Sequence, residues 1–257
     1  MTRIDPPARF AFLLPTLLAV LLLAGCGNEV EVFPEATGAA DAGHVMRNSP
    51  TGCVVLAFSA YPFRPGAPLD GLTRAVEAAI GRVPCSAASF YWSEKAMAER
   101  WLVEQLRTRA QTGQPIRVIL AGHGLGATEA IETAREIIHR TPNAEITMLL
   151  TLDAVKPGKI NYAAGAAGAA VNRLPGVKMN MSLVAHDTAP PVDGMRLLAH
   201  VNYFQTKNSV YHGMTIPGAE NHHLDDWSGF LNHGNIDDFA YPLLAADIRA
   251  AVARGSR

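Results

Sequence analysis

Two glycines bracket the residue at which nucleophilic chemistry is expected. The stretch Gly122-His123-Gly124-Leu125-Gly126 has the spacing of the G-x-S-x-G motif, in which a serine stands on a tight, strained turn between a buried strand and a helix. A short apolar run, Ile116 to Ala121, enters the motif, and a helical stretch, Ala127 to Arg140, leaves it. Gly124 takes the place of the serine. The sequence therefore predicts the turn without its hydroxyl.

An acid and a base follow in the chain order of a serine triad, which is nucleophile, acid and then histidine. Asp153 ends the predicted strand after the glycine turn, and His233 precedes the last predicted helix. The acid would orient the imidazole and stabilise its cation, while the imidazole would take a proton from a nucleophile. Asp187 and Asp193 are alternative acids, and capping a turn is the alternative role for Asp153.

The other histidines carry weaker signals. His222 and His223 form a polar cluster with Asp225 and Asp226, which we interpret as a solvated loop, because adjacent histidines rarely close a metal site without further spaced ligands. His123 is expected to shape the turn through hydrogen bonds. The turn lacks the lysine of a P-loop and the wider glycine spacing of a dinucleotide fingerprint, so no metal or other cofactor is predicted.

Together these segments resemble the lipase and esterase branch of the α/β-hydrolase superfamily. The resemblance covers essentially residues 52–254 and rests on Gly122-His123-Gly124-Leu125-Gly126-Ala127, Leu150-Thr151-Leu152-Asp153, Asn202-Tyr203-Phe204-Gln205 and His233. It implies an α/β-hydrolase fold, with a mostly parallel central sheet and helices on both faces. It also assigns the nucleophile position to Gly124, the acid to Asp153 and the base to His233.

An oxyanion hole in such a fold uses two backbone N–H groups. One belongs to the residue after the nucleophile position, Leu125, and the other to the loop Ser59 to Phe63, where Ser59 and Ala60 are the candidates. Backbone donors do not depend on side chains. We therefore expect the pocket to bind a carbonyl, carboxylate or similar group although it cannot be acylated at residue 124.

Strands and helices alternate along the chain, which favours a mostly parallel sheet covered on both faces. The Gly- and Ala-rich residues 156–178 are expected to form a surface loop or the start of a lid. Besides the two elements around the glycine turn, strands are expected at Cys53–Ser59, Ala87–Trp92, Ile146–Leu152 and Leu198–Phe204, and helices at Leu72–Ile80, Glu94–Ala110 and Leu243–Val252.

The N-terminus has the features of an export signal. Arg3 and Arg9 precede an almost unbroken apolar run, Phe10 to Leu22, and the run ends in Leu23-Ala24-Gly25-Cys26. This ending resembles the lipobox of bacterial lipoproteins, which implies removal of residues 1–25 and a lipid on Cys26. An ordinary secretory signal is the alternative. We expect a lipid-anchored protein on the periplasmic side of the cell envelope, and Gly27, which is not an aspartate, favours the outer membrane.

Residues 26–50 are expected to be a lipid-anchored tether, followed by one α/β domain over residues 51–257. Cys53 and Cys85 each precede a predicted strand at the same edge of the sheet, and they form either a disulfide or two buried free thiols. The formal net charge is −1, without a basic stripe, so nucleic acid is not an expected partner.

Two functions are compatible with these observations. The first is a catalytically impaired protein or pseudoenzyme that keeps a binding role for a small acyl or ester-like ligand. The second is an active carboxylic-ester hydrolase in which His233 activates water, or in which another hydroxyl replaces the nucleophile. The candidate hydroxyls are those of Ser59, Ser93 and Thr128.

Overall fold

The computed structural model describes residues 43–50, 52–61, 69–113, 115–141, 143–157, 183–185, 198–207 and 212–254. Their centre is a seven-stranded sheet in the order β1-β3-β2-β4-β5-β8-β9, in which β1 pairs antiparallel with β3 and the other pairs are parallel. Strands β6 and β7 form a separate antiparallel pair. The strands are β1 (His44–Arg47), β2 (Val54–Ser59), β3 (Ser86–Tyr91), β4 (Ile116–His123), β5 (Ala144–Leu152), β6 (Val155–Pro157), β7 (Leu183–Ala185), β8 (His200–Phe204) and β9 (Glu220–His223). The helices are α2 (Gly71–Ile80), the short 3-10 helix η1 (Trp92–Glu94), α3 (Lys95–Ala110), α4 (Leu125–Arg140) and α6 (Ile236–Ala253).

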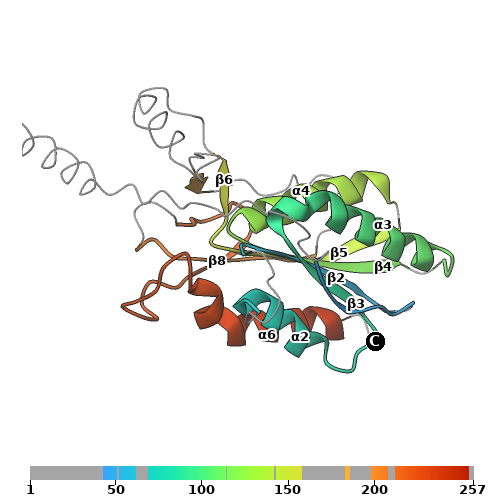
Figure 1. Ribbon diagram of the computed structural model, residues 1–257, viewed down its shortest axis with the longest axis horizontal. Helices are drawn as coiled ribbons and strands as arrows, with labels where there is room; N and C mark the ends of the chain where they lie inside the picture. The colour runs from blue at the N-terminus through green and yellow to red at the C-terminus, as the bar shows by residue number, and fades with distance from the viewer. Residues whose placement is uncertain are drawn as a thin grey trace, which may run out of the picture. The chain divides into compact units, whose positions relative to one another are not determined.

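Helices cover both faces of the sheet: α2 and α6 lie on one side, and α3 and α4 on the other (Figure 1). Strand β2 is buried along its whole length, as a strand between two helical layers must be. Its side chains alternate between the layers, so that Val55 and Ala57 belong to the core beside α2 and α6, while Leu56 and Phe58 belong to the core beside α3 and α4. The predicted fold class, an α/β fold with a mostly parallel sheet and helices on both faces, is confirmed.

Strand β1 lies within the segment predicted as a tether. It is held by the edge of β3 and by long side chains: Arg47 donates to the carbonyl oxygens of Val83 (2.7 Å) and Gly81 (2.6 Å), and His44 contacts Glu77 (2.8 Å). These partners lie more than 30 residues away. The local composition of residues 44–47 therefore did not predict their order.

Two other elements differ from the sequence prediction. Strand β9 includes His222 and His223, which were predicted to lie in a loop. It is a short edge strand whose side chains are mainly exposed, so it lacks the apolar alternation that identifies a strand. Helix α6 begins at Ile236 rather than Leu243 and continues through Pro242, because Ile236, Ala240 and Leu244 share a buried face.

A disulfide joins Cys53 and Cys85, whose Cα atoms are 4.5 Å apart, just before the paired starts of β2 and β3. Residues 1–42, with the leader and Cys26, lie outside the described residues, as do most of the loop predicted at 156–178 and the alternative acids Asp187 and Asp193. None of the helices that the structure describes is both long and apolar enough to cross a membrane.

Candidate active site

The glycine turn joins β4 to α4 as the motif predicts. Gly124 has φ +59° and ψ −122°, a backbone conformation that side-chain-bearing residues rarely adopt. The bracketing glycines permit close packing: a Cβ on Gly122 would stand 2.2 Å from the carbonyl oxygen of Gly126, and one on Gly126 would stand 2.3 Å from that of Phe58. The start of α4 therefore packs closely against the sheet, and this packing leaves the turn only one backbone path.

Backbone hydrogen bonds fix the turn against the end of β5. The Gly124 amide donates to the carbonyl of Leu152 (2.9 Å), and the Gly124 carbonyl accepts from the amides of Ala127 (3.1 Å) and Val155 (3.2 Å). Since β5 also carries the candidate acid at its end, the acid and the nucleophile position are held in one frame.

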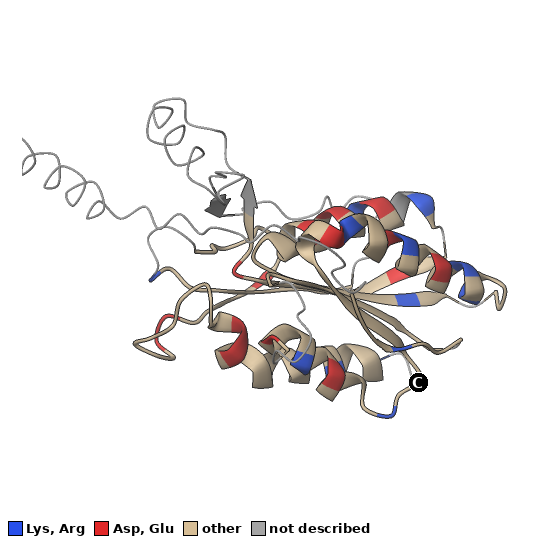
Figure 2. Ribbon diagram, in the orientation of Figure 1, with Lys and Arg blue, Asp and Glu red and all other residues tan. Residues whose placement is uncertain are grey.

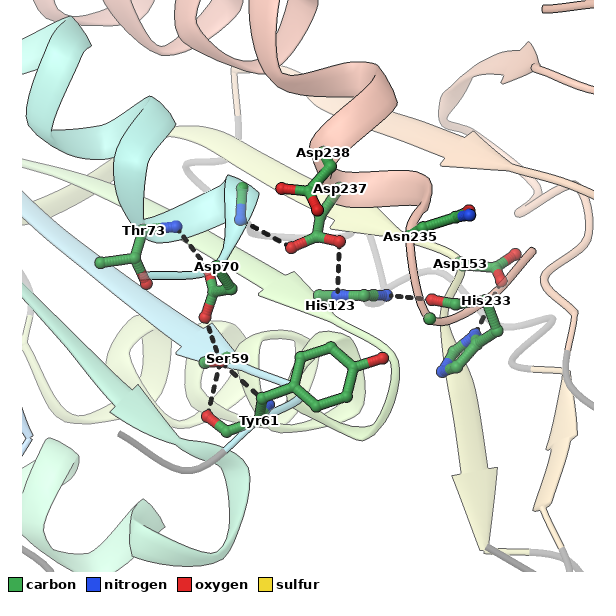
Figure 3. Close-up of polar contacts among 12 residues, drawn as sticks. Ser59, Tyr61, Asp70, Thr73, His123, Asp153, His233, Asn235, Asp237 and Asp238 are labelled. Carbon is green, nitrogen blue, oxygen red and sulfur yellow. Dashed lines mark hydrogen bonds and ion pairs between the residues drawn. The ribbon is translucent and has the colours of Figure 1, made fainter. Parts of the chain in front are cut away.

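Asp153 and His233, 80 residues apart in the chain, form a buried pair (Figure 3). Oδ2 of Asp153 lies 2.7 Å from Nδ1 of His233, and both residues are buried. A carboxylate accepts, so Nδ1 donates and the neutral imidazole presents its unprotonated Nε2 on the far side of the ring. This is the orientation that a general base requires.

Three further donors hold the Asp153 carboxylate. Gln205 donates from its backbone amide (3.2 Å) and from its side-chain Nε2 (2.9 Å), and the Gly213 amide donates to Oδ1. A Cβ on Gly213 would stand 2.8 Å from Oδ1, so a side chain there would prevent this close approach. Neither Gln205 nor Gly213 was predicted to hold the acid. The position of Gln205 directly after β8, at the carboxyl edge of a parallel sheet, was the available signal.

The imidazole of His233 stands directly above Gly124. A Cβ built on Gly124 would lie 2.9 Å from Nε2 and 3.2 Å from Cε1 of His233, and 3.5 Å from Cβ of Ala60. The direction of a side chain at residue 124 therefore points at the base, as the triad order predicts. His233 lies so close to Gly124 that a longer side chain at residue 124 would fit only if the imidazole moved.

The predicted oxyanion residues lie around the same point. Ala60 follows β2 and faces Gly124, while Leu125 is the first residue of α4, where the amides lack partners inside the helix. The positive end of the α4 dipole adds to their attraction for a negative oxygen. Backbone N–H groups at a helix N-terminus are donors of the kind that oxyanion holes use.

Two of the three alternative hydroxyls are engaged elsewhere. Thr128 Oγ1 donates to the carbonyl of Val155. Ser59 Oγ is buried and contacts the carbonyl of Tyr61 (2.8 Å) and the carboxylate of Asp70, while accepting from the Tyr61 amide (3.0 Å). Ser59 is therefore part of the support beneath the site, and its hydroxyl is bonded to Asp70 rather than to His233.

Burial raises the pKa of Asp70, and the charge of Asp237 adds to this shift, against hydrogen bonds from Ser59 and from the Thr73 amide. The Ser59 hydroxyl has one hydrogen and faces two acceptors, the Tyr61 carbonyl and Asp70.

His123 ties the glycine turn to the loop that carries the base. Its Nε2 donates to the carbonyl of His233 (2.9 Å), and its Nδ1 lies 3.9 Å from Oδ1 of Asp237. Asp237, in the first turn of α6, accepts from the Gly71 amide (2.8 Å). In its predicted structural role, His123 thus holds the backbone of His233 in place.

The His222 and His223 cluster lies on β9, away from these contacts. The two rings stack on Tyr203 and Phe204 with centroids 4.8 and 4.9 Å apart. Over the part of the chain that the structure describes, no group of three or more His, Cys, Asp or Glu side chains could hold a metal ion.

Neither the models of known protein families nor the curated proteins include a match to this chain. Similar solved structures include a thioesterase domain from the curacin biosynthetic pathway, with a TM-score of 0.41, 13% identity and coverage of 79% of this chain and 93% of that one. They also include the esterase domain of a Rhodothermus marinus protein, with a TM-score of 0.40, 12% identity and coverage of 82% and 91%. These likenesses concern the fold alone; what the site can do follows from its own residues.

Proposed function

We propose that this chain is a lipid-anchored, hydrolase-like protein of a bacterial envelope that binds an acyl or ester-like group without being acylated by it. Gly124 carries the proposal. The Cβ of a side chain at this position would lie 2.9 Å from Nε2 of His233. Glycine has no side chain, so it offers no nucleophile to this base. Loss of the nucleophile of a serine triad costs around six orders of magnitude in kcat in a protease.

The binding half of the proposal rests on backbone groups that the glycine does not affect. The first amide of α4, at Leu125, and the loop at Ala60 lie beside Gly124. They suit the oxygen of a carbonyl or a carboxylate, such as an ester or a free acid. The Cys53–Cys85 disulfide supports the export half, because disulfides persist in oxidising compartments.

A second candidate is slow ester hydrolysis by water that His233 activates. The observation in its favour is the intact pair of Asp153 and His233, held by three further donors. However, the imidazole lies close over Gly124, so a water would enter between them only after His233 had withdrawn. We therefore place binding first and this reaction second.

The test replaces Gly124 with serine and, as a matched control, with alanine. Both variants place a Cβ at 2.9 Å from Nε2 and impose a positive φ on a side-chain-bearing residue, at a cost of about 1–3 kcal/mol. Only serine adds a hydroxyl. A serine Oγ hydrogen-bonded to Nε2 keeps its Cβ roughly 3.5 Å away, so His233 must retreat by about 0.5 Å.

We expect no reaction of the wild type or of Gly124→Ala with a fluorophosphonate probe, and labelling of Gly124→Ser at residue 124. We also expect Gly124→Ser to hydrolyse short-chain p-nitrophenyl esters above background, and Asp153→Asn or His233→Ala to abolish the gain. Thermal melting identifies variants that fail to fold. Labelling of the wild type within the glycine turn would contradict the proposal. A folded Gly124→Ser without activity would show that Asp153 and His233 no longer act as an acid–base pair.

A further inference from the structure

Exposed apolar side chains gather on one segment of the domain. Of the seven large hydrophobic residues exposed among the described residues, four lie between residues 212 and 239. They are Met214 (39% exposed), Trp227 (50%), Phe230 (85%) and Phe239 (39%). The Phe230 ring stands on ordered backbone, since the side-chain amides of Asn232 and Asn235 both donate to the Phe230 carbonyl. Such a group on an otherwise polar surface is typical of an interaction site.

This apolar segment lies at the same edge of the sheet as the candidate site. Strand β9 runs parallel to β8, so the loop 224–235 leaves the sheet at the carboxyl ends of the strands and leads into α6 (Figure 1). Phe230 lies three residues before His233. Met214 follows Gly213, whose amide donates to Asp153. The backbone that carries Phe230 and Met214 therefore lies beside His233 and Asp153.

The chain also enters the described domain at the level of this edge. Gly43 packs against the Phe90 ring, with a built Cβ only 2.4 Å from it, and β1 then runs away from the site, antiparallel to β3. Phe90 is paired with Phe58, and Phe58 with Gly122. Gly43 thus lies level with the glycine turn, three strands or about 14 Å to the side. Sixteen residues lie between it and Cys26, a reach of at most about 60 Å.

Charged side chains cover the outer sides of the helices on the other part of the described surface (Figure 2). Lys and Arg alternate with Asp and Glu along the outer sides of α3 and α4, where they form ion pairs such as Lys95 with Glu129 and Arg135 with Glu132 (Figure 2). The other three exposed hydrophobic residues are single and lie on different elements: Val45 on β1, Val103 on α3 and Leu198 before β8. Single exposed hydrophobic residues are normal on a soluble surface.

We propose that this edge faces a lipid bilayer, with Trp227 and Phe230 inserted among the headgroups and the site opening toward the membrane. The inference rests on the lipid anchor of the proposed function. A lipid anchor keeps the domain near the bilayer, so even a weak second contact forms readily and sets which face points toward the membrane. Aromatic rings prefer the interface between water and lipid tails. Asp225 and Asp226 precede Trp227, Lys207 donates to the Ser228 carbonyl (2.8 Å), and Asp238 pairs with Arg74. Because charges of both signs stand along this loop, rather than a cluster of cations that would select anionic lipids, the surface is committed to zwitterionic ones.

The orientation also assigns a ligand class to the site. With the edge against a bilayer, an acyl or ester group reaches His233 and the Leu125 amide from the lipid rather than from bulk water. The ligand is therefore expected to be lipid-like, with its polar oxygen at the glycine turn and its chain toward the exposed rings.

The test measures which side of the bound protein touches lipid. The full chain, purified with its own N-terminal modification, is reconstituted in phosphatidylcholine vesicles with and without brominated acyl chains, which quench tryptophan fluorescence. The wild type is compared with Trp227→Phe, because Trp92 and Trp101 remain in both. Trp227→Phe combined with Val103→Trp is the matched control, which moves the probe to an exposed position on α3. Mass spectrometry of the same sample determines the state of Cys26.

We expect brominated lipid to remove most of the Trp227 emission and to leave that of Val103→Trp unchanged. Phe230→Ser should reduce the quenching of Trp227, and Val103→Ser should not. Equal quenching at both probes, or none at Trp227, would overturn the inference. So would an unmodified Cys26, or a Trp227 that becomes buried only when the chain forms dimers. None of these readouts uses activity, so the experiments at residue 124 stand or fall separately.

Discussion

The position of the His233 backbone is fixed by a side chain of the glycine turn. His123 lies inside the glycine turn, is buried, and donates to the carbonyl of His233. The ring of Tyr61 packs edge-on against it, with centroids 5.9 Å apart. The distance between His233 and Gly124 therefore depends on a hydrogen bond as well as on the acid.

Replacing His123 by alanine should lower the free energy of unfolding by about 1–3 kcal/mol, because the buried carbonyl of His233 loses its donor. Glutamine, whose amide can donate at a similar distance, should recover part of this loss. Urea unfolding of the two variants measures both effects. In the Gly124→Ser background, alanine at 123 should lower kcat more than it raises KM. An alanine variant as stable as the wild type would refute the role assigned to His123.

Among single residues, the sequence predicted those at the centre of the site but not those that hold Asp153 in place. Gly124, Asp153 and His233 could be found because the motif fixes the spacing of the first, and chain order selects the other two. Gln205 and Gly213 could not be found in this way. Each donates a backbone N–H group to the carboxylate of Asp153, which lies more than 50 residues away in the chain. No local sequence pattern indicates such a contact.

Among the elements, α2 depends on an acid that also supports the loop after β2. Asp70 caps the helix by accepting from the Thr73 amide (2.7 Å) and contacts Ser59, while burial raises its pKa. A carboxyl group with a raised pKa binds its proton more tightly in the folded protein than in the unfolded chain. Stability therefore falls as the pH rises from the usual value, 3.8, through the folded pKa, and is level above it.

Asp70→Asn should remove this fall, because asparagine keeps a capping oxygen and does not titrate. Urea unfolding at a series of pH values from about 4 upward measures the stability of the wild type minus that of the variant, which should fall as the pH rises through the folded pKa of Asp70 and stay constant above it. Asp70→Ser is the control, since it also caps a helix without titrating. If the three proteins show the same pH dependence, the slope does not come from Asp70.

The disulfide acts on the pairing of β2 with β3. It joins residues 32 apart in sequence, and closing a loop of this length restricts the unfolded chain by about 3–4 kcal/mol. We expect Cys53→Ala combined with Cys85→Ala to lose about this much stability in urea. Reductant should lower the unfolding midpoint of the wild type and leave that of the double variant unchanged. An unfolding midpoint that reductant leaves unchanged in both proteins would contradict a disulfide between Cys53 and Cys85.

The elements were predictable where burial gives them a pattern. Strands β2, β4 and β5 are buried runs and were found with small shifts at their ends, whereas β1 and β9 are edge strands whose order comes from a neighbour. The last helix was predicted to begin at Leu243, whereas α6 begins at Ile236 and includes Pro242, because its buried face outweighs the hydrogen bond that proline cannot donate.

For the whole molecule, the order of the sheet brings together groups that the chain keeps apart. The turn after β4, the acid after β5, the base before α6 and the chain's entry at Gly43 all lie at one edge. Alternating elements predicted this for the first three, because parallel strands end at a common edge. They did not predict it for Gly43, whose position follows from the antiparallel register of β1.

The four donors around Asp153 bear on how such a site evolves. Substituting Asp153 would leave buried N–H groups of Gln205 and Gly213 without an acceptor, at about 1–3 kcal/mol for each. Selection for a folded protein alone would therefore retain the acid, and with it the orientation of His233, whether or not a nucleophile stands at residue 124. An intact acid–base pair is thus no record of current catalysis. Because glycine and serine codons can differ by one base, a hydroxyl at residue 124 is one mutational step away.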